Sequence, residues 1–116
     1  MASRKEHNAD CERLLGFKCD PVNKWLDEKF KHLGPLHRCI RHHTKGILEA
    51  SLKFGELGRK AAIIHILKDC GHIPTFEDWH HPSKLNHLGM IEASTFNGYW
   101  DIHKFDEEVK KLLEMS

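Results

Sequence analysis

Apolar residues recur at helical spacing along nearly the whole chain, and glycines and prolines divide this pattern into segments. Asp20 and Pro21 are residue types favoured at a helix start, and Gly71 follows an apolar segment where a C-terminal cap glycine belongs. The pattern predicts a mostly α-helical fold of about five helices. We expect one helix to end at Gly16, one to extend from Pro21 to Leu33, others to cover residues 36–54 and 60–70, a short one to follow Thr75, and the last to begin after Asp101.

Residues 80–100 interrupt the helical pattern. Pro82, Gly89 and Gly98 favour loops or a short hairpin in this segment. The chain of 116 residues contains no linker, internal repeat or low-complexity segment, and its length is typical of one domain. We therefore predict a single helical domain, residues 1–116, with a loop-rich or hairpin segment near residues 80–100.

The charge balance argues against several classes of protein. The chain has 18 Lys and Arg against 17 Asp and Glu, a formal net charge of +1, and the two signs are interspersed. Because a nucleic-acid binder relies on excess positive charge, we expect no direct nucleic-acid binding. No stretch approaches the roughly 20 apolar residues of a membrane span, and the N-terminus has no apolar signal region. We expect a cytoplasmic protein whose four cysteines stay reduced.

Eleven of the 116 residues are histidines, several times the ordinary content. Neutral imidazole is the commonest side-chain ligand of transition metals in proteins. His65 and Asp69 are four residues apart on a predicted helix, so their side chains share one face and could supply two ligands of a metal site. The alternative is a surface contact between the two side chains, worth about 0.2–0.5 kcal/mol.

Further candidate ligands lie between residues 32 and 43. His32, His37 and His42 recur every five residues, a spacing that turns side chains about 140° apart on a helix. These three histidines can meet only if the chain breaks near the Gly-Pro pair between the first two. Cys39 and His43, four residues apart, are rival ligands. We expect a zinc site that combines ligands from this region with the pair on the later helix, with the helices packed around it.

The number of ligands decides between two roles for such an ion. A structural zinc site has four protein ligands and is closed, whereas a catalytic site keeps one position open for water, with a carboxylate nearby. The histidines and the later aspartate are similar to those of metal-dependent phosphohydrolases with a His…His-Asp…Asp arrangement. In this chain, however, His42 is followed by His43 and not by aspartate. The sequence therefore favours a non-catalytic metal site. An open site would favour a hydrolase of a nucleotide or other phosphoester.

A run of punctuated motifs extends over roughly residues 22–79. It comprises Trp25-Leu26-Asp27-Glu28, His32, His37-Arg38, Arg41-His42-His43, Gly46-Ile47, Phe54-Gly55, His65-x-x-x-Asp69-x-Gly71-x-Ile73-Pro74-Thr75 and Asp78-Trp79. These motifs resemble a small uncharacterised family found in phages and bacterial mobile elements. The resemblance implies that the metal ligands are His32, His37, His42, His65 and Asp69, and Cys39 and His43 are less typical of it.

The chain is also similar, in size and histidine content, to zinc-containing anti-CRISPR proteins that inhibit Cas9. This likeness implies a host defence protein such as Cas9 as the partner, bound by an exposed surface. Phe96, Tyr99 and Trp100 are aromatic residues of the type that anchors such interfaces. We therefore expect a zinc-binding inhibitor of a defence nuclease, acting in the host bacterial cytoplasm, with the metal-dependent phosphohydrolase as the alternative.

Overall fold

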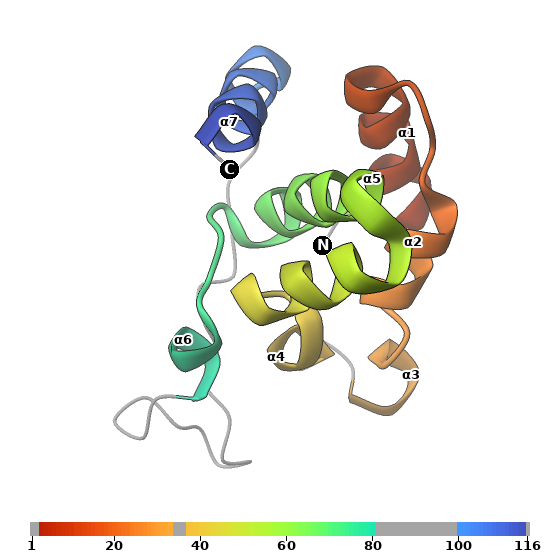
Figure 1. Ribbon diagram of the computed structural model, residues 1–116, viewed down its shortest axis with the longest axis vertical. Helices are drawn as coiled ribbons and strands as arrows, with labels where there is room; N and C mark the ends of the chain where they lie inside the picture. The colour runs from red at the N-terminus through yellow and green to blue at the C-terminus, as the bar shows by residue number, and fades with distance from the viewer. Residues whose placement is uncertain (1–2, 34–36, 81–99, 116) are drawn as a thin grey trace.

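The computed structural model describes residues 3–33, 37–80 and 100–115, and all regular structure in these ranges is helical (Figure 1). The mostly α-helical fold predicted from the sequence is confirmed. The loops or hairpin expected near residues 80–100 fall almost wholly in residues 81–99, which lie outside the described residues. In chain order the helices are α1 (Arg4–Leu15), α2 (Asp20–Leu26), α3 (Phe30–Leu33), α4 (Arg38–Arg41), α5 (Thr44–Cys70), α6 (Phe76–His80) and α7 (Ile102–Met115).

Helix α5 is the centre of the fold. α1, α2, α4 and α7 all pack against it, and α6 contacts α4 (Figure 1). Residues 61–67 of α5 are buried on every side, which fits their almost uninterrupted apolar sequence. No helix among the described residues is long and apolar enough to cross a membrane. The apolar core consists of Cys11, Val22, Trp25, Leu26, Ala50, Ala61, Ala62, Ile64, Ile66, Leu67, Cys70, Trp79, Phe105 and Val109.

A kink divides α5 into two arms. Gly55 has φ 81° and ψ −166°, a backbone conformation that favours glycine. The arm after the kink contains the helix predicted over residues 60–70. The arm before it is the second part of the helix predicted over residues 36–54. α5 therefore joins two predicted elements in one bent helix.

Two of the predicted helices are interrupted where the sequence pattern is continuous. Residues 27–29 separate α2 from α3, and residues 42–43 separate α4 from α5. The second break has a local cause, because the Nδ1 atom of His43 accepts a hydrogen bond of 3.1 Å from the backbone N–H of Gly46 and so caps α5. A Cβ atom at position 46 would overlap the carbonyl oxygen of Arg41, so only glycine allows this close approach of α4 and α5. The breaks leave Asp27 and His42 at the ends of helices.

Helix ends that depend on local signals lie where the sequence predicts them. Gly16 and Gly71 end α1 and α5 in the left-handed conformation, with φ of 85° and 77°. Thr75 Oγ1 accepts a 3.2 Å hydrogen bond from the N–H of Asp78, and Oδ2 of Asp78 accepts one of 2.8 Å from the N–H of Thr75, so this reciprocal pair caps the start of α6. Asp101 Oδ1 accepts a 2.8 Å hydrogen bond from the N–H of His103 at the start of α7.

Candidate metal centre

Helix α5 holds His65 and Asp69 on one face, one turn apart, as their spacing predicted. The Nε2 atom of His65 lies 3.3 Å from Oδ2 of Asp69, and neither side chain is exposed. Because α1, α2 and α4 pack against α5, this polar pair lies inside the fold and not on a helix surface.

The two helix breaks bring Asp27 and His42 to the same place. Oδ1 of Asp27 lies 3.2 Å from Nε2 of His65 and 3.5 Å from Nε2 of His42. The Nε2 atom of His42 lies 3.3 Å from Oδ2 of Asp69. Single ligand atoms of Asp27, His42, His65 and Asp69, the ligand group, all lie within 4.8 Å of one another. The group could hold a metal ion.

The spacing within the ligand group suits an ion as well as it suits hydrogen bonds. The four nitrogen–oxygen separations are 3.2, 3.3, 3.3 and 3.5 Å. Hydrogen bonds between N–H and oxygen are usually about 2.7–3.2 Å long, and each Nε2 here faces two carboxylates although it has only one site for a proton. Four ligands about 2.05 Å from a tetrahedral zinc ion are roughly 3.3 Å apart. These four nitrogen–oxygen separations are therefore compatible with ligands that share one ion.

Contacts from α6 and α2 hold His42 in the ligand group. The indole Nε1 of Trp79 donates a 2.8 Å hydrogen bond to the carbonyl oxygen of His42. Next to it, the N–H of Thr44 donates a 2.9 Å hydrogen bond to the carbonyl oxygen of Pro74. On the other side, the guanidinium of Arg41 donates a 2.6 Å hydrogen bond to the carbonyl oxygen of Trp25 and lies 4.2 Å from the centre of its indole ring. Long-range contacts therefore fix the residue 42–43 turn.

Asn23 fixes the orientation of the His65 ring. Its Oδ1 atom lies 3.0 Å from Nδ1 of His65, while its Nδ2 donates to Oδ1 of Asn8 at 2.8 Å and to the carbonyl oxygen of Lys18 at 3.2 Å. Because Oδ1 of an amide can only accept, the proton of the neutral His65 ring is on Nδ1. Its Nε2 lone pair then points into the ligand group, which is the arrangement a metal-binding histidine needs.

Two more buried histidines contact the carboxylates from outside the ligand group. His37 Nε2 donates a 2.9 Å hydrogen bond to Oδ1 of Asp27. The Nε2 atom of His7 lies 3.2 Å from Oδ1 of Asp69, and its ring stacks on that of His65 with the ring centres 3.5 Å apart. These histidines orient the carboxylates in the way that outer partners orient metal ligands.

The electrostatics of the site keep its carboxylates charged. Burial alone would raise the pKa of Asp69, but its contacts with His42, His65 and His7 hold that pKa well below the usual range. Burial would likewise raise the pKa of Asp27, but hydrogen bonds from His37 and His65 lower it. Burial lowers the pKa of His42 to about 3, against its hydrogen bond with Asp69. The site therefore offers two anionic oxygens and a neutral imidazole at neutral pH.

His65 retains a proton in the absence of metal. Burial by itself would lower the pKa of His65, but hydrogen bonds to Asp27 and Asp69 and the charges of these carboxylates raise it to about 9. One imidazolium thus offsets one of two carboxylates, and the ligand group carries a net negative charge at neutral pH. A divalent cation that replaced this proton would bring the net charge of the ligand group to zero.

The profile of one protein family matches residues 4–88, which is more than half of the chain. The chain belongs to the DUF6915 family. DUF6915 is described as a domain of unknown function, and no curated protein or solved structure matches the chain. The ligand group lies wholly within the DUF6915 match, whereas α7 lies outside it. The predicted resemblance to an uncharacterised family is confirmed, while phage origin and the inhibition of Cas9 stay predictions.

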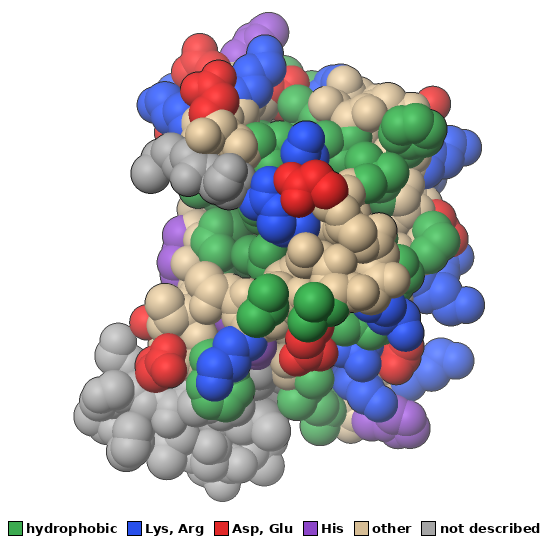
Figure 2. Space-filling view, in the orientation of Figure 1, with side chains coloured by type: hydrophobic (Ala, Val, Ile, Leu, Met, Phe, Trp, Pro, Cys, Tyr) green, Lys and Arg blue, Asp and Glu red, His purple; other side chains and the backbone are tan. Residues whose placement is uncertain are grey.

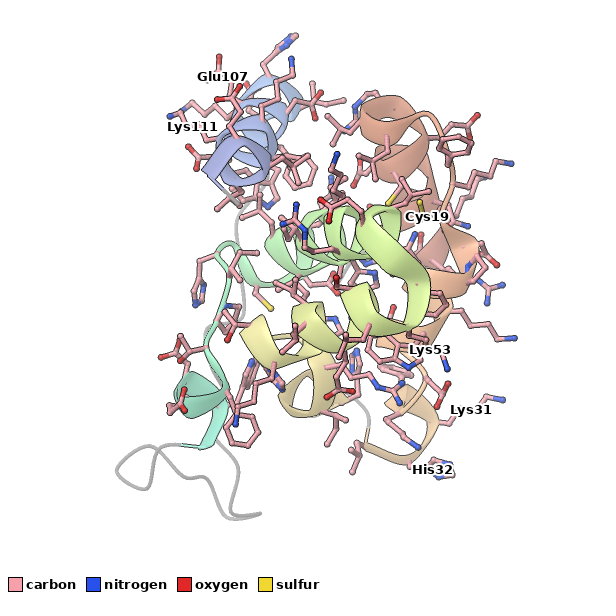
Figure 3. The ribbon with its side chains drawn as sticks, viewed as in Figure 1. Cys19, Lys31, His32, Lys53, Glu107 and Lys111 are labelled. Atoms are coloured by element: carbon pink, nitrogen blue, oxygen red, sulfur yellow. The ribbon has the colours of Figure 1, made fainter. Side chains whose placement is uncertain are left out.

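The DUF6915 structure brings some of the sequence-predicted ligands together. His42, His65 and Asp69 belong to the ligand group, and His37 contacts it through Asp27. His32, in contrast, is exposed on α3 and its side chain points away from the body of the molecule (Figure 3). The physical reason is that the Phe30 ring lies edge-on to His37, with the ring centres 5.4 Å apart, and residues two apart on a helix point about 200° apart.

The rival pair has a different place in the structure. His43 caps α5 through Nδ1, and its ring lies edge-on to Phe76 with the ring centres 5.3 Å apart. The side chain of Cys39 lies outside the described residues. Among the described cysteines, Cys11 and Cys70 are buried in the apolar core and do not belong to the ligand group.

Sequence reasoning missed Asp27 and His7. Asp27 lies inside a continuous predicted helix, and the motif that contains it does not mark it as a ligand. His7 had one usable signal, because Cys11 follows it by four residues and His7 therefore shares the buried face of α1. His7 and Asp27 contact residues of α5 that are tens of positions later in the sequence, and a local sequence pattern does not predict such contacts.

Proposed function

We propose that this DUF6915 protein binds one zinc ion at Asp27, His42, His65 and Asp69 and uses it to hydrolyse a phosphate ester. The observation that carries the proposal is that Asp27 belongs to the ligand group and also lines a surface pocket. The other three side chains are fully buried, but the Asp27 side chain is 24% exposed. It also lines a surface pocket of about 720 Å³, the Asp27 pocket. A small molecule in this pocket would approach the metal site from the side of Asp27. There a water or phosphate oxygen would be a fifth ligand, an expansion that catalytic zinc sites allow.

The types of ligand in the group support a catalytic role for the ion in addition to stabilisation of the fold. Structural zinc sites are usually built with cysteine thiolates, whereas two imidazoles with carboxylates are typical of catalytic sites. Imidazole favours zinc, and carboxylates also suit manganese, so these two ions are the ones to compare. Had all four ligands been sealed from solvent, the zinc-dependent inhibitor expected from the sequence would be the better proposal.

The hydrolysis needs only water as a second reactant. A bound divalent ion lowers the pKa of water and offsets charge on a phosphoryl group. The oxygen of water forms a bond to phosphorus, the ester P–O bond breaks, and a proton of the water ends on the departing alcohol. Glu28 is the other carboxylate that lines the Asp27 pocket, and we assign it to carry that proton.

The test is the hydrolysis of p-nitrophenyl phosphate and bis(p-nitrophenyl) phosphate by the full chain loaded with zinc or manganese. We expect many turnovers per chain, loss of activity with a chelator, and a lower kcat for Glu28→Gln at unchanged metal content. A metal-loaded protein that hydrolyses neither ester would contradict the proposal. One-for-one inhibition of a purified nuclease such as Cas9 by that protein would instead favour the inhibitor expected from the sequence.

Asn23→Ala is expected to weaken zinc binding by about 10- to 100-fold, the usual cost of removing an outer partner of a histidine ligand. The substitution removes the acceptor for the Nδ1 proton of His65. Competition with a chromophoric chelator would measure the affinity. Asn8→Ala is the comparison, because it removes one of the hydrogen bonds that orient Asn23 but keeps the oxygen that faces His65, so its loss of affinity should be smaller. An Asn23→Ala variant that binds zinc as tightly as the unchanged protein would show that Asn23 has no positioning role.

Zinc affinity is expected to rise with pH up to about 9. Below its pKa of about 9, His65 of the metal-free protein is protonated, so the ion must displace a proton. The folding stability of the metal-free protein, in contrast, is expected to fall as the pH rises. The pKa of His65 is raised on folding, so its contribution to stability is complete below its unfolded pKa and is lost as pH rises through 9. Chelator competition and melting curves at pH 6, 7, 8 and 9 would measure both trends. Zinc affinity independent of pH in this range would contradict the assignment of His65 as a ligand.

A further inference from the structure

The Asp27 pocket combines positive charge with an exposed aromatic ring. Among its lining residues are Arg4 of α1, Lys24 of α2, and Phe30 and Lys31 of α3. We infer that it binds a nucleoside monophosphate, with the phosphate on the cations beside Asp27 and the base on Phe30. This inference rests on the proposed function and names its substrate class.

The basic side chains of the pocket come from three helices, and two of these side chains form no ion pair with a described residue. Arg4 forms an ion pair of 3.3 Å through Nε with Asp20, which holds its guanidinium at the pocket. Neither Lys24 nor Lys31 has an ion-pair partner among residues 3–33, 37–80 and 100–115. Figure 3 shows Lys31 projecting from α3, and Figure 2 shows Lys and Arg side chains along the edge of the molecule where α2 and α3 lie. An anion at this edge would meet donors that no internal carboxylate occupies.

Phe30 provides a flat surface next to the candidate metal centre. Phe30 is 42% exposed, so part of its ring is accessible to a ligand in the pocket. The ring is held edge-on against His37, and His37 in turn donates its hydrogen bond to Asp27. Stacking of a base on an aromatic side chain is worth about 1–3 kcal/mol. Phe30 is therefore positioned to bind a base while the phosphate reaches toward Asp27.

The size and charge of the pocket favour one nucleotide over a polymer. Its volume of about 720 Å³ is within the range of small-ligand sites. The pocket is lined by two acidic side chains, Asp27 and Glu28, as well as its three basic side chains. The whole chain has a formal net charge of only +1. A longer strand would need a continuous basic track, because each phosphate contact adds its own electrostatic contribution. One phosphate and one base suit the groups present.

Calorimetric titration of the zinc-loaded full chain tests the inference. The probes are AMP, ribose 5-phosphate and adenosine, with the non-hydrolysable phosphonate analogue of AMP used if AMP is turned over. We expect AMP to bind at least tenfold more tightly than either fragment. The double variant Lys24→Ala/Lys31→Ala should lose at least tenfold in AMP affinity. Phe30→Ala should lose AMP affinity and leave that for ribose 5-phosphate unchanged.

The control is Lys110→Ala/Lys111→Ala on α7, which removes the same charge outside the pocket and should bind AMP normally. No AMP binding by a protein that holds zinc and hydrolyses p-nitrophenyl phosphate would overturn the inference but not the proposed function. Tight AMP binding with no hydrolysis of any ester would overturn the proposed function alone. Equal affinities for AMP and ribose 5-phosphate would exclude the role of Phe30, and tighter binding of a short oligonucleotide would show that the ligand is a nucleic acid.

Discussion

Removal of the bound metal with a chelator is expected to lower the melting temperature of the protein by about 10 °C or more. The ligand group is assembled from the residue that follows α2, the residue 42–43 turn and α5, so an ion bound there links three parts of the fold. A ligand present at about 1,000 times its dissociation constant stabilises the folded state by roughly 4 kcal/mol. In a domain of this length each kcal/mol shifts the melting temperature by about 2–8 °C.

Calorimetry or circular dichroism before chelation, after it, and after reloading with zinc would measure this shift. Reloading should restore the first melting curve, which separates loss of metal from irreversible damage. A melting temperature that does not change on chelation, in protein shown to have contained an equivalent of metal, would mean that the ion binds elsewhere or contributes nothing to folding.

Asp69→Ala is expected to reduce the bound metal from about one equivalent to almost none and to destabilise the fold by about 3–5 kcal/mol, the usual cost of removing one partner from a buried charged pair. Asp69 lies within 3.3 Å of Nε2 atoms of His7, His42 and His65. Without it, three buried imidazoles lose their shared carboxylate. Elemental analysis of untagged protein and denaturant unfolding would measure the two effects.

Asp106→Ala is the control for Asp69→Ala, because Asp106 pairs only with Arg13 near the surface among the described contacts. It should keep its metal and lose at most about 1 kcal/mol of stability. Asp69→Asn preserves the shape of the side chain and removes its charge, so it should fold and still bind zinc poorly. A folded Asp69→Asn variant with an undiminished zinc content would remove Asp69 from the ligand group.

The sequence predicts those parts of this fold that depend on neighbouring residues. Gly16, Gly71 and Thr75 mark helix ends through backbone conformation and side-chain caps, and these ends are where the pattern places them. His65 and Asp69 belong to the same class, because one helical turn separates them. Each of these signals is complete within about four residues of chain.

The rest of the site depends on contacts between distant residues. The helix predicted over residues 36–54 breaks at 42–43 because Trp79 and Pro74 accommodate that turn from beyond the end of α5. Asp27 becomes a candidate ligand only when α2 ends one residue before it. The recurrence of histidines every five residues does not bring His32 to the ligand group, because the short helix α3 turns that side chain to solvent.

The most direct measurement is X-ray diffraction from crystals of the zinc-loaded, untagged protein at energies on either side of the zinc absorption edge. We predict one anomalous peak per chain, about 2.0–2.2 Å from Nε2 of His42, Nε2 of His65 and carboxylate oxygens of Asp27 and Asp69. A peak bound by surface histidines such as His32, or no peak in crystals grown with an equivalent of zinc, would contradict the assignment of these four residues as the metal site.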